Sequence, residues 1–290
     1  MVIKQRNKFL NKIIIGSAQL KNGYGLDKSK VNKRELFKIL NYAKKNKIQF
    51  LDTAQVYGNS EIMIGRRKKD NLKIISKFFL NQKTLRNPEN WFLNQFKKTS
   101  KNLKTKNVYG ILIHNPSFLT KKKEIFNYFK KLKNLNLVKK IGFSIYSEKD
   151  LIFILNNFNF DIIQLPYSIF DRRFEKYFKI LKKRKIKIHC RSIFLQGLLI
   201  NLKHQRKKYF LSWRAVFDKF NNWIRNNKPN HLSACLSFVF ANKYLDKIII
   251  GVNTKKNLEE ILSTKIYEKK IFPKFGTRDK KLLNPVNWKL

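Results

Sequence analysis

The stretch YGILIHNPSFLTKKKEIFNYFKKLKNLNLVKKIGFS, residues 109–144, contains the unit from which the fold can be worked out. It begins with a short apolar run, Tyr109–His114, continues through an amphipathic stretch of helix length, Lys122–Leu135, and ends in a second apolar run, Val138–Ser144. Short runs rich in β-branched residues are typical of buried strands, and apolar residues recurring every three or four positions are typical of a helix. This order predicts two parallel strands joined by a helical crossover.

The same alternation extends along the chain in both directions. Further strand-like runs occupy Lys12–Ala18, Gln49–Thr53, Leu72–Lys77, Asp161–Leu165, Ile186–Ser192 and Lys247–Gly251. Helical patterns between them cover Lys33–Asn46, Asn59–Arg66, Glu89–Leu103, Glu148–Asn156, Glu175–Lys183, His231–Asn242 and Thr254–Leu262. Eight strand–helix units can close into a barrel without exposed edges, so the sequence predicts an α/β fold, a (β/α)8 TIM barrel, as a single domain over residues 1–290.

An open doubly wound sheet is the alternative fold. No G-x-G-x-x-G motif follows the first strand, because Gly16, Gly23 and Gly25 have a different spacing, and this argues against a dinucleotide-binding sheet of that kind. The longest gap between strands, residues 194–231, is expected to hold a loop and a helix. The tail after Leu262 has no strand pattern and is expected to pack across one mouth of the barrel.

The charge is extreme, since 65 Lys and Arg against 18 Asp and Glu give a net charge of +47. Such an excess raises nucleic acid or acidic membranes as partners. The lysines are spread along the chain, however, and Lys, Asn, Ile and Phe, which share A- and T-rich codons, are abundant together. We attribute the charge to composition and expect no specific nucleic-acid partner and no membrane partner. A basic nucleic-acid-binding protein is kept as the less favoured alternative.

Other classes of protein are excluded by what the chain lacks. No apolar run approaches the roughly 18 residues needed to cross a bilayer, and the start MVIKQRNKFLNK has no apolar signal core, so a cytoplasmic location is expected. Cys190 and Cys235 fall in a predicted strand and a predicted helix and are expected to be buried thiols. The histidines show no zinc-ligand spacing, and no metal site is expected; His189 is interpreted as a satisfied structural residue.

Polar side chains follow successive predicted strands at the end where barrel enzymes place their sites. Asp52 and Tyr57 follow the second strand, Lys77 ends the third and His114 ends the fourth. Tyrosine has a reference pKa of about 10 and can therefore supply a proton at neutral pH. A lysine ammonium nearby would lower that pKa, a carboxylate would serve as its counter-ion, and a neutral imidazole can donate a hydrogen bond to a substrate oxygen. This set fits the proton-donating half of a carbonyl reduction. Glu61 is expected to contact Arg66 or a backbone amide instead.

The sequence resembles the aldo/keto reductase family in a series of stretches that cover nearly the whole chain in order. They are LDTAQVYGNSE (51–61), ILIHNP (111–116), LVKKIGFSIYS (137–147), IIQLPYSIFDRR (162–173), RSIFLQGLL (191–199) and IIIGVNTKKNLEEIL (248–262). The resemblance implies a (β/α)8 barrel, NADPH as cofactor, and a catalytic tetrad of Asp52, Tyr57, Lys77 and His114 with Tyr57 as the acid. It also implies cofactor contacts from Gly16, Ser17, Ser144, Gln164, Ser192, Gly251 and Asn253.

The chain departs from the family pattern in three places. Ile145 stands where an asparagine is frequent, and Arg191 or Ser192 replaces an aromatic that commonly stacks on the nicotinamide. The arginine that usually binds the 2′-phosphate of NADPH aligns with Asn257, and the asparagine after it with Ile261. Lys255 and Lys256 are the candidate substitutes, since a lysine can pair with phosphate as a point charge. NADH therefore stays open beside NADPH.

The expected function is reduction of an aldehyde or ketone, possibly sugar-derived, by a nicotinamide-dependent oxidoreductase that acts as a monomer. Specificity should come from the loops at Phe78–Pro88, Pro116–Thr120 and Gln196–Trp213. The alternative on the same barrel is a regulatory protein that holds the nucleotide and turns over slowly or not at all. The complete tetrad argues against that alternative.

Overall fold

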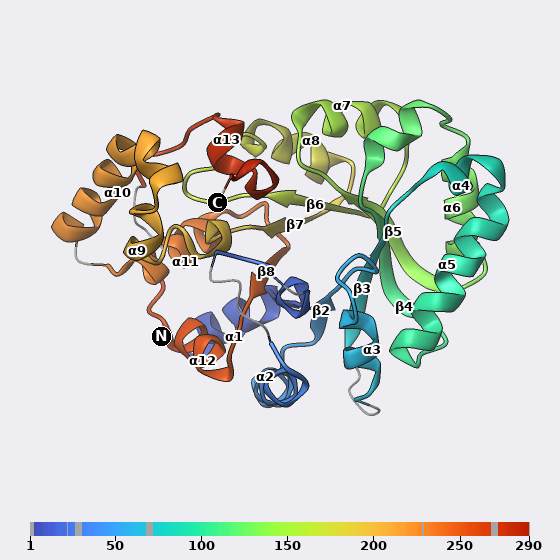
Figure 1. The fold of residues 1–290 in the computed structure, drawn as a ribbon, viewed down its shortest axis with the longest axis horizontal. Helices are drawn as coiled ribbons and strands as arrows, with labels where there is room; N and C mark the ends of the chain where they lie inside the picture. Colours follow the sequence, from blue (N-terminus) through green and yellow to red (C-terminus); the bar gives the residue numbers. More distant parts are fainter. Residues whose placement is uncertain are drawn as a thin grey trace.

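The computed structural model describes residues 3–21, 23–26, 31–67, 72–227, 229–267 and 272–289. Eight parallel strands form a closed barrel in sequence order, with the first strand paired to both the second and the eighth (Figure 1). The strands are β1 Ile13–Gly16, β2 Phe50–Asp52, β3 Lys73–Phe78, β4 Val108–Ile113, β5 Val138–Ser144, β6 Ile162–Pro166, β7 Lys187–Arg191 and β8 Lys247–Gly251. The predicted (β/α)8 barrel is confirmed, and each strand lies within two residues of its predicted range.

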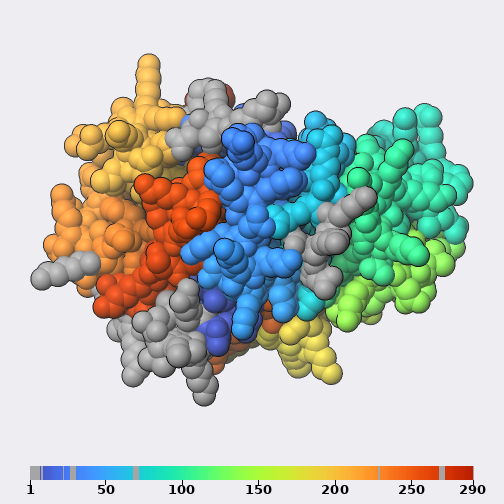
Figure 2. All heavy atoms as spheres, turned by 90° about the horizontal axis from the view of Figure 1, so that it is seen from below, coloured from blue at the N-terminus to red at the C-terminus, as the bar shows by residue number. Residues whose placement is uncertain are grey.

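Helices between the strands cover the outside of the barrel, and further helices precede β1 and follow β8. Their bounds are α1 Ile3–Lys12, α2 Lys33–Lys45, α3 Ser60–Gly65, α4 Gln82–Arg86, α5 Pro88–Leu103, α6 Ile125–Asn134, α7 Glu148–Asn157, α8 Phe178–Lys183, α9 Leu202–Gln205, α10 Arg214–Asn227, α11 His231–Ala241, α12 Lys255–Ser263 and α13 Lys280–Leu283. Asn32, Ser147 and Thr254 cap α2, α7 and α12 with side-chain oxygens, which explains where these helices begin. Figure 2 shows α2 and α12, from opposite ends of the sequence, side by side.

Two segments differ from the sequence-based expectation. Residues Ile3–Lys12, for which no helix is predicted from the sequence, form α1, and Phe9 of this helix packs against Phe240 of α11 with ring centroids 4.5 Å apart. The gap after β7 contains α9 and α10 before α11, and α10 lies beyond the ring of barrel helices (Figure 1).

The tail packs at the mouth of the barrel, as expected. Its Thr277 amide donates to the Phe170 carbonyl oxygen in the loop after β6, and Trp213 Nε1 donates to Asp279 Oδ2 at 2.9 Å. Val286 of the tail contributes to the cavity described below.

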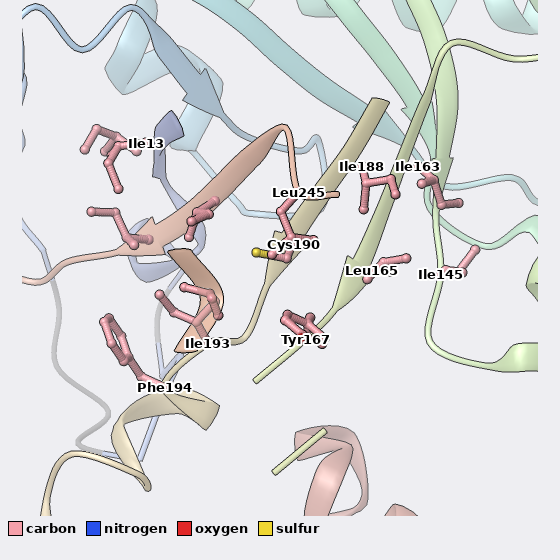
Figure 3. Packing of buried hydrophobic residues seen from close by; sticks show 14 of the residues in the cluster. Ile13, Ile145, Ile163, Leu165, Tyr167, Ile188, Cys190, Ile193, Phe194 and Leu245 are labelled. Atoms are coloured by element: carbon pink, nitrogen blue, oxygen red, sulfur yellow. The ribbon is translucent and has the colours of Figure 1, made fainter. Parts of the chain in front are cut away.

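The core has an outer layer between strands and helices and an inner layer within the barrel. Figure 3 shows part of the outer layer, where Ile163 and Leu165 of β6 lie beside Ile188 and Cys190 of β7. Both cysteines are buried free thiols, which confirms that prediction. The inner layer is one separate apolar cluster formed by Ile14, Phe50, Ile75, Leu112, Ile162 and Ile249.

The inner layer determines which side chains reach the mouth of the barrel. Side chains on a strand alternate between its two faces, so the residue two positions after an inward residue also points inward. Two positions after the inner layer stand Gly16, Asp52, Lys77, His114, Gln164 and Gly251. The same spacing from Gly142 and His189 brings Ser144 and Arg191 to the mouth. The pleat of the barrel therefore collects one polar residue or glycine from every strand.

Candidate active site

A cavity of about 1190 Å³ opens at the carboxyl ends of the strands. Its wall includes Asp52, Tyr57 and His114. Each of the three predicted specificity loops contributes to it, with Phe79 from the first, Pro116 from the second and Gln196 from the third among the lining residues. Small-ligand sites are usually about 300–1,000 Å³, so this cavity has room for a cofactor and a substrate together.

Lys77 forms a buried ion pair with Asp52 of the cavity wall. Lys77 Nζ lies 2.6 Å from Asp52 Oδ2 and donates to the Thr53 carbonyl oxygen at 2.8 Å, while Gln164 Nε2 donates to Asp52 Oδ1 at 2.7 Å. The Lys77 side chain is 0% exposed and that of Asp52 5%. Burial lowers the pKa of Lys77, and the Asp52 carboxylate acts in the opposite direction. The counter-ion expected from the sequence is therefore present.

Tyr57 lies over this pair, with Lys77 Nζ 5.1 Å from the centre of its ring. Burial raises the pKa of the Tyr57 phenol, as do the Asp52 carboxylate and the Tyr146 phenol, and the phenol is protonated at neutral pH. The cation that lowers the pKa is the Arg191 guanidinium. The sequence also predicts this effect for Lys77, whose ammonium lies beside the ring, and that role stays a prediction. Arg191, unlike Lys77, has no carboxylate partner among the described residues.

His114 is the second cavity residue beside Tyr57, and the two rings meet edge to face with centroids 6.1 Å apart. Burial lowers the pKa of His114 to about 3, with Lys77 and Arg191 contributing in the same direction. The imidazole is therefore neutral at physiological pH. Its Nδ1 is buried and has no hydrogen-bond partner among the described residues.

The other residues implied by the resemblance divide into two groups. Those that line the cavity are Gly16, Ser144, Gln164, Ser192, Gly251 and Asn253. Ser17 does not line it, because its hydroxyl hydrogen-bonds that of Ser60 at 2.8 Å, and Ser60 in turn contacts the Thr53 hydroxyl at 2.7 Å. In this structure Ser17 supports the β1–β2 end, and its assignment as a cofactor contact stays a prediction.

Glu61 has a structural role, as expected, but with different partners. It is buried on α3 and accepts hydrogen bonds from Ser76 at 2.7 Å, Thr99 at 3.0 Å and Asn102 at 3.1 Å. These contacts join α3 to β3 and α5, and Arg66 is not among them. Glu61 thus holds in place the helix that follows the Tyr57 loop.

Several cavity residues were not identified from the sequence. They are Gln19 and Tyr24 from the loop after β1 and Tyr146 after β5. Gln19 Oε1 is buried without a hydrogen-bond partner among the described residues, and a Cβ on Gly251 would collide with the Gln19 side chain. The glycine at 251 was the available signal, since it marks a close approach to the strand end.

Comparison with known proteins agrees with this geometry. The sequence model of the aldo/keto reductase family matches residues 12–268 of this chain. The chain belongs to the aldo/keto reductase family. Two solved structures have the same fold. The aldo-keto reductase AKR11C1 from Bacillus halodurans, in its holo form, is 17% identical to this chain, with 88% of each chain covered and a TM-score of 0.72. The glycerol dehydrogenase AKR11B4 from Gluconobacter oxydans is 17% identical, with 89% of this chain and 88% of that chain covered and a TM-score of 0.67. No curated protein matches the sequence.

The described residues contain no group of three or more His, Cys, Asp or Glu side chains placed to hold a metal ion. None of the helices described is long and apolar enough to cross a membrane.

Because two histidines are buried, we expect the free energy of unfolding to depend on pH. Burial lowers the pKa of His114 and of His189 to about 3, and His189 Nδ1 has no partner among the described residues, so the satisfied histidine expected there was wrong. In the unfolded chain both imidazoles take up a proton as the pH falls below about 6.5, whereas in the folded chain they stay neutral down to about pH 3. The free energy of unfolding is therefore highest above pH 6.5 with respect to these two groups, and it falls as the pH is lowered toward 3. Between pH 6.5 and 4.5, urea unfolding should show a free energy of unfolding that falls by up to about 1.4 kcal/mol per pH unit for each group.

A variant separates the two contributions. His189→Asn should reduce this slope by the share of one group, whatever its effect on the absolute stability. A free energy of unfolding that stays constant over the same pH range in the wild type would contradict the buried, neutral state of both rings.

Proposed function

We propose that this aldo/keto reductase reduces an aldehyde or ketone to the alcohol with a nicotinamide cofactor, and that Tyr57 is the proton donor. The observation that carries the proposal is the convergence, at one cavity, of a protonated phenol, a neutral imidazole and a buried ammonium–carboxylate pair. The pleat of the barrel brings these groups together from β2, β3 and β4.

The reaction would divide between the cofactor and the protein. A bound reduced nicotinamide supplies a hydride to the carbonyl carbon. Tyr57 holds the proton that passes to the carbonyl oxygen, and it remains protonated up to alkaline pH because its pKa is raised. The phenolate left behind is stabilised by the Lys77 and Arg191 cations. Neutral His114 has one N–H to donate to the carbonyl oxygen, which orients the substrate.

The cavity fits a dinucleotide in chemistry as well as size. Gln19 Oε1 is a buried acceptor without a partner among the described residues, so it can accept a hydrogen bond from a ligand. Ser144 and Gln164 stand side by side at the ends of β5 and β6, with Ser144 Oγ 3.5 Å from Gln164 Oε1, and suit a carboxamide such as that of nicotinamide. Gly16 and Gly251, paired across β1 and β8, both line the cavity, and the missing side chain at Gly251 lets Gln19 approach the strand end.

NADPH is the cofactor that the resemblance implies, and NADH is the second candidate. Lys255 Nζ pairs with Glu259 at 2.8 Å and, like Lys256, does not line the cavity. The wall beyond Gly251 instead includes Glu260 and Asn257. A carboxylate can accept hydrogen bonds from a ribose diol and repels a phosphate, so this wall favours NADH.

The cofactor prediction is tested by binding. Quenching of tryptophan fluorescence should show that NADH binds at least as tightly as NADPH. Glu260→Gln should tighten NADPH binding severalfold, about 2- to 5-fold for an exposed and screened charge, and leave NADH within about twofold. Tighter binding of NADPH than of NADH by more than about tenfold in the wild type would restore NADPH as the physiological cofactor.

The function itself is tested by single-turnover hydride transfer. Enzyme loaded with the better-binding reduced nucleotide is mixed with a panel of aldehydes and ketones, and loss of absorbance at the reduced nicotinamide band is followed. Stoichiometric oxidation, with the alcohol recovered as product, is the expected result. Tight nucleotide binding without oxidation by any member of the panel would instead favour the regulatory alternative.

A further inference from the structure

We propose that Arg191 is a substrate-binding residue and that the carbonyl substrate carries an oxyanion, a carboxylate or a phosphate, which this guanidinium binds. The inference rests on the proposed function and names the substrate class of the same site. The inward spacing of β7 places Arg191 at the mouth of the barrel, two residues beyond buried His189, and the residue lines the cavity together with Tyr57 and His114.

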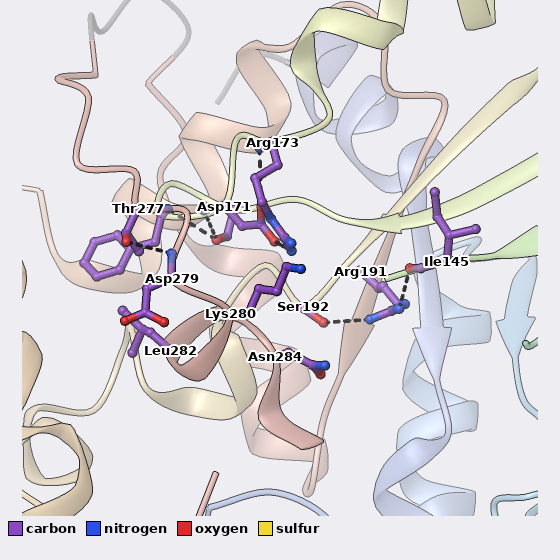
Figure 4. Close-up of polar contacts among 12 residues, drawn as sticks. Ile145, Asp171, Arg173, Arg191, Ser192, Thr277, Asp279, Lys280, Leu282 and Asn284 are labelled. Carbon is purple, nitrogen blue, oxygen red and sulfur yellow. Dashed lines mark hydrogen bonds and ion pairs between the residues drawn. The ribbon is translucent and has the colours of Figure 1, made fainter. Parts of the chain in front are cut away.

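The guanidinium is held in position before any ligand binds. Arg191 Nη2 donates to the Ile145 carbonyl oxygen at 2.9 Å and Nη1 to the Ser192 hydroxyl at 3.3 Å, as Figure 4 shows. The guanidinium carbon lies 3.9 Å from the centre of the Tyr146 ring. A stacked and anchored arginine loses little side-chain entropy when it binds an anion, because that entropy has already been lost on folding.

Arg191 carries an uncompensated charge. No ion pair joins it to a carboxylate among the described residues, in contrast to Lys77, which pairs with Asp52, and Arg173, which pairs with Asp171 at 2.8 Å. Its two contacts to uncharged oxygens leave N–H groups for a ligand, since a guanidinium has five. A half-buried cation without a counter-ion, beside a cavity, is a site for an anion.

The charge acts at the reacting end of the cavity. The Arg191 guanidinium lowers the pKa values of Tyr57 and Tyr24, and it also lowers the pKa of His114. These three residues come from the loops after β1 and β2 and from the end of β4, and they line the same cavity as Arg191. An oxyanion bound here would belong to the same molecule as the carbonyl group that Tyr57 protonates.

The backbone after Arg191 is bent in a way that supports a functional role. Ser192, Leu195 and Gln196 all have positive φ values, 61°, 47° and 54°, within the six residues that begin with Arg191. Non-glycine residues in this conformation cost free energy and are found mainly where a site requires them. The bend turns the chain into the loop whose residues Gln196 and Lys203 also line the cavity.

Matched substrate pairs test the inference. In the first pair, 4-carboxybenzaldehyde is compared with methyl 4-formylbenzoate, and in the second, glyceraldehyde 3-phosphate with glyceraldehyde, so that the two pairs distinguish carboxylate from phosphate. The quantity measured is the ratio of kcat/KM for the charged member to that for its neutral partner. In the wild type this ratio should be about 10 to 100 in at least one pair, as expected for charge-assisted hydrogen bonds.

Variants then assign the preference to Arg191. Arg191→Met should reduce the ratio to near one, mainly through KM for the charged member, and Arg191→Lys should retain part of it. A ratio is used because loss of Arg191 also alters Tyr57, and this effect is common to both members of a pair. Lys203→Met removes a different cation that lines the cavity and should leave the ratio unchanged. An equal fall in this variant would attribute the preference to the overall positive charge and overturn the inference.

The outcomes separate the inference from the proposed function. If the neutral members are turned over and neither pair shows a preference for the charged member, the inference about Arg191 is refuted and the proposal of carbonyl reduction is not affected. If no carbonyl compound is reduced, calorimetric binding of 4-(hydroxymethyl)benzoate and of glycerol 3-phosphate still decides: one of them should bind the wild type about tenfold or more tightly than Arg191→Met. Equal binding of both ligands to the two proteins would refute a role for Arg191 in holding an oxyanion.

Discussion

Replacing Tyr57 by phenylalanine should lower kcat at least about 100-fold and leave the dissociation constant of the reduced nucleotide within about twofold. The Tyr57 phenol lines the cavity, is protonated at neutral pH and lies over the Lys77–Asp52 pair. The Tyr57 hydroxyl has no protein hydrogen-bond partner among the described residues, so removing it should disturb neither the fold nor the cavity. Steady-state kinetics and fluorescence titration of the same preparation provide both numbers.

Tyr128→Phe is the matched control for this substitution. Tyr128 is a half-buried tyrosine on α6 that packs against the core away from the cavity, so the variant loses the same atom without touching the site. Its kcat should equal that of the wild type. A Tyr57→Phe enzyme with wild-type kcat would remove Tyr57 from the role of proton donor, and loss of nucleotide binding in that variant would show that Tyr57 shapes the site instead.

The barrel was predictable because each of its strands is a short apolar run followed by a helix with its own periodicity. β5 and β8 have the bounds read from the sequence, and the strands on either side of them differ by one or two residues. The ends of parallel strands meet at one mouth, so polar residues at those ends were predicted to converge. Asp52, Lys77 and His114 all stand there, two residues beyond members of the inner apolar layer.

Residues whose roles depend on contacts across the fold were not predictable in the same way. Ser17 follows a strand and could have faced the cavity, but the bond to Ser60 from α3 turns its hydroxyl away. Arg191 was noticed only as a departure from the family pattern. Its effect on Tyr57 depends on the Tyr146 ring and the Ile145 carbonyl, which a neighbouring strand brings beside it. Sequence spacing identifies the face of a strand, and only packing determines which charges remain unpaired there.

Lys77→Met should lower the free energy of unfolding by about 3–5 kcal/mol and reduce kcat as well. The substitution nearly preserves side-chain volume, so the cost comes from charge. It leaves the Asp52 carboxylate buried with Gln164 as its remaining side-chain hydrogen-bond donor among the described residues. Burial without a counter-ion raises the pKa of this carboxyl group, so folding at neutral pH requires either a buried unpaired charge or the uptake of a proton, and both cost free energy. Urea unfolding at pH 7 measures the change.

Adding Asp52→Asn to Lys77→Met tests whether the cost is electrostatic. Asparagine keeps the shape of Asp52 and an oxygen that can accept from Gln164 Nε2, but it carries no charge, so the double variant should recover most of the lost stability, to within about 1–2 kcal/mol of the wild type. Its kcat should stay as low as that of Lys77→Met, because the phenolate formed at Tyr57 still lacks the ammonium below it. A double variant as unstable as Lys77→Met would mean that the cost comes from packing around the lysine stem. A double variant with restored turnover would mean that this ion pair supports the fold and takes no part in proton transfer.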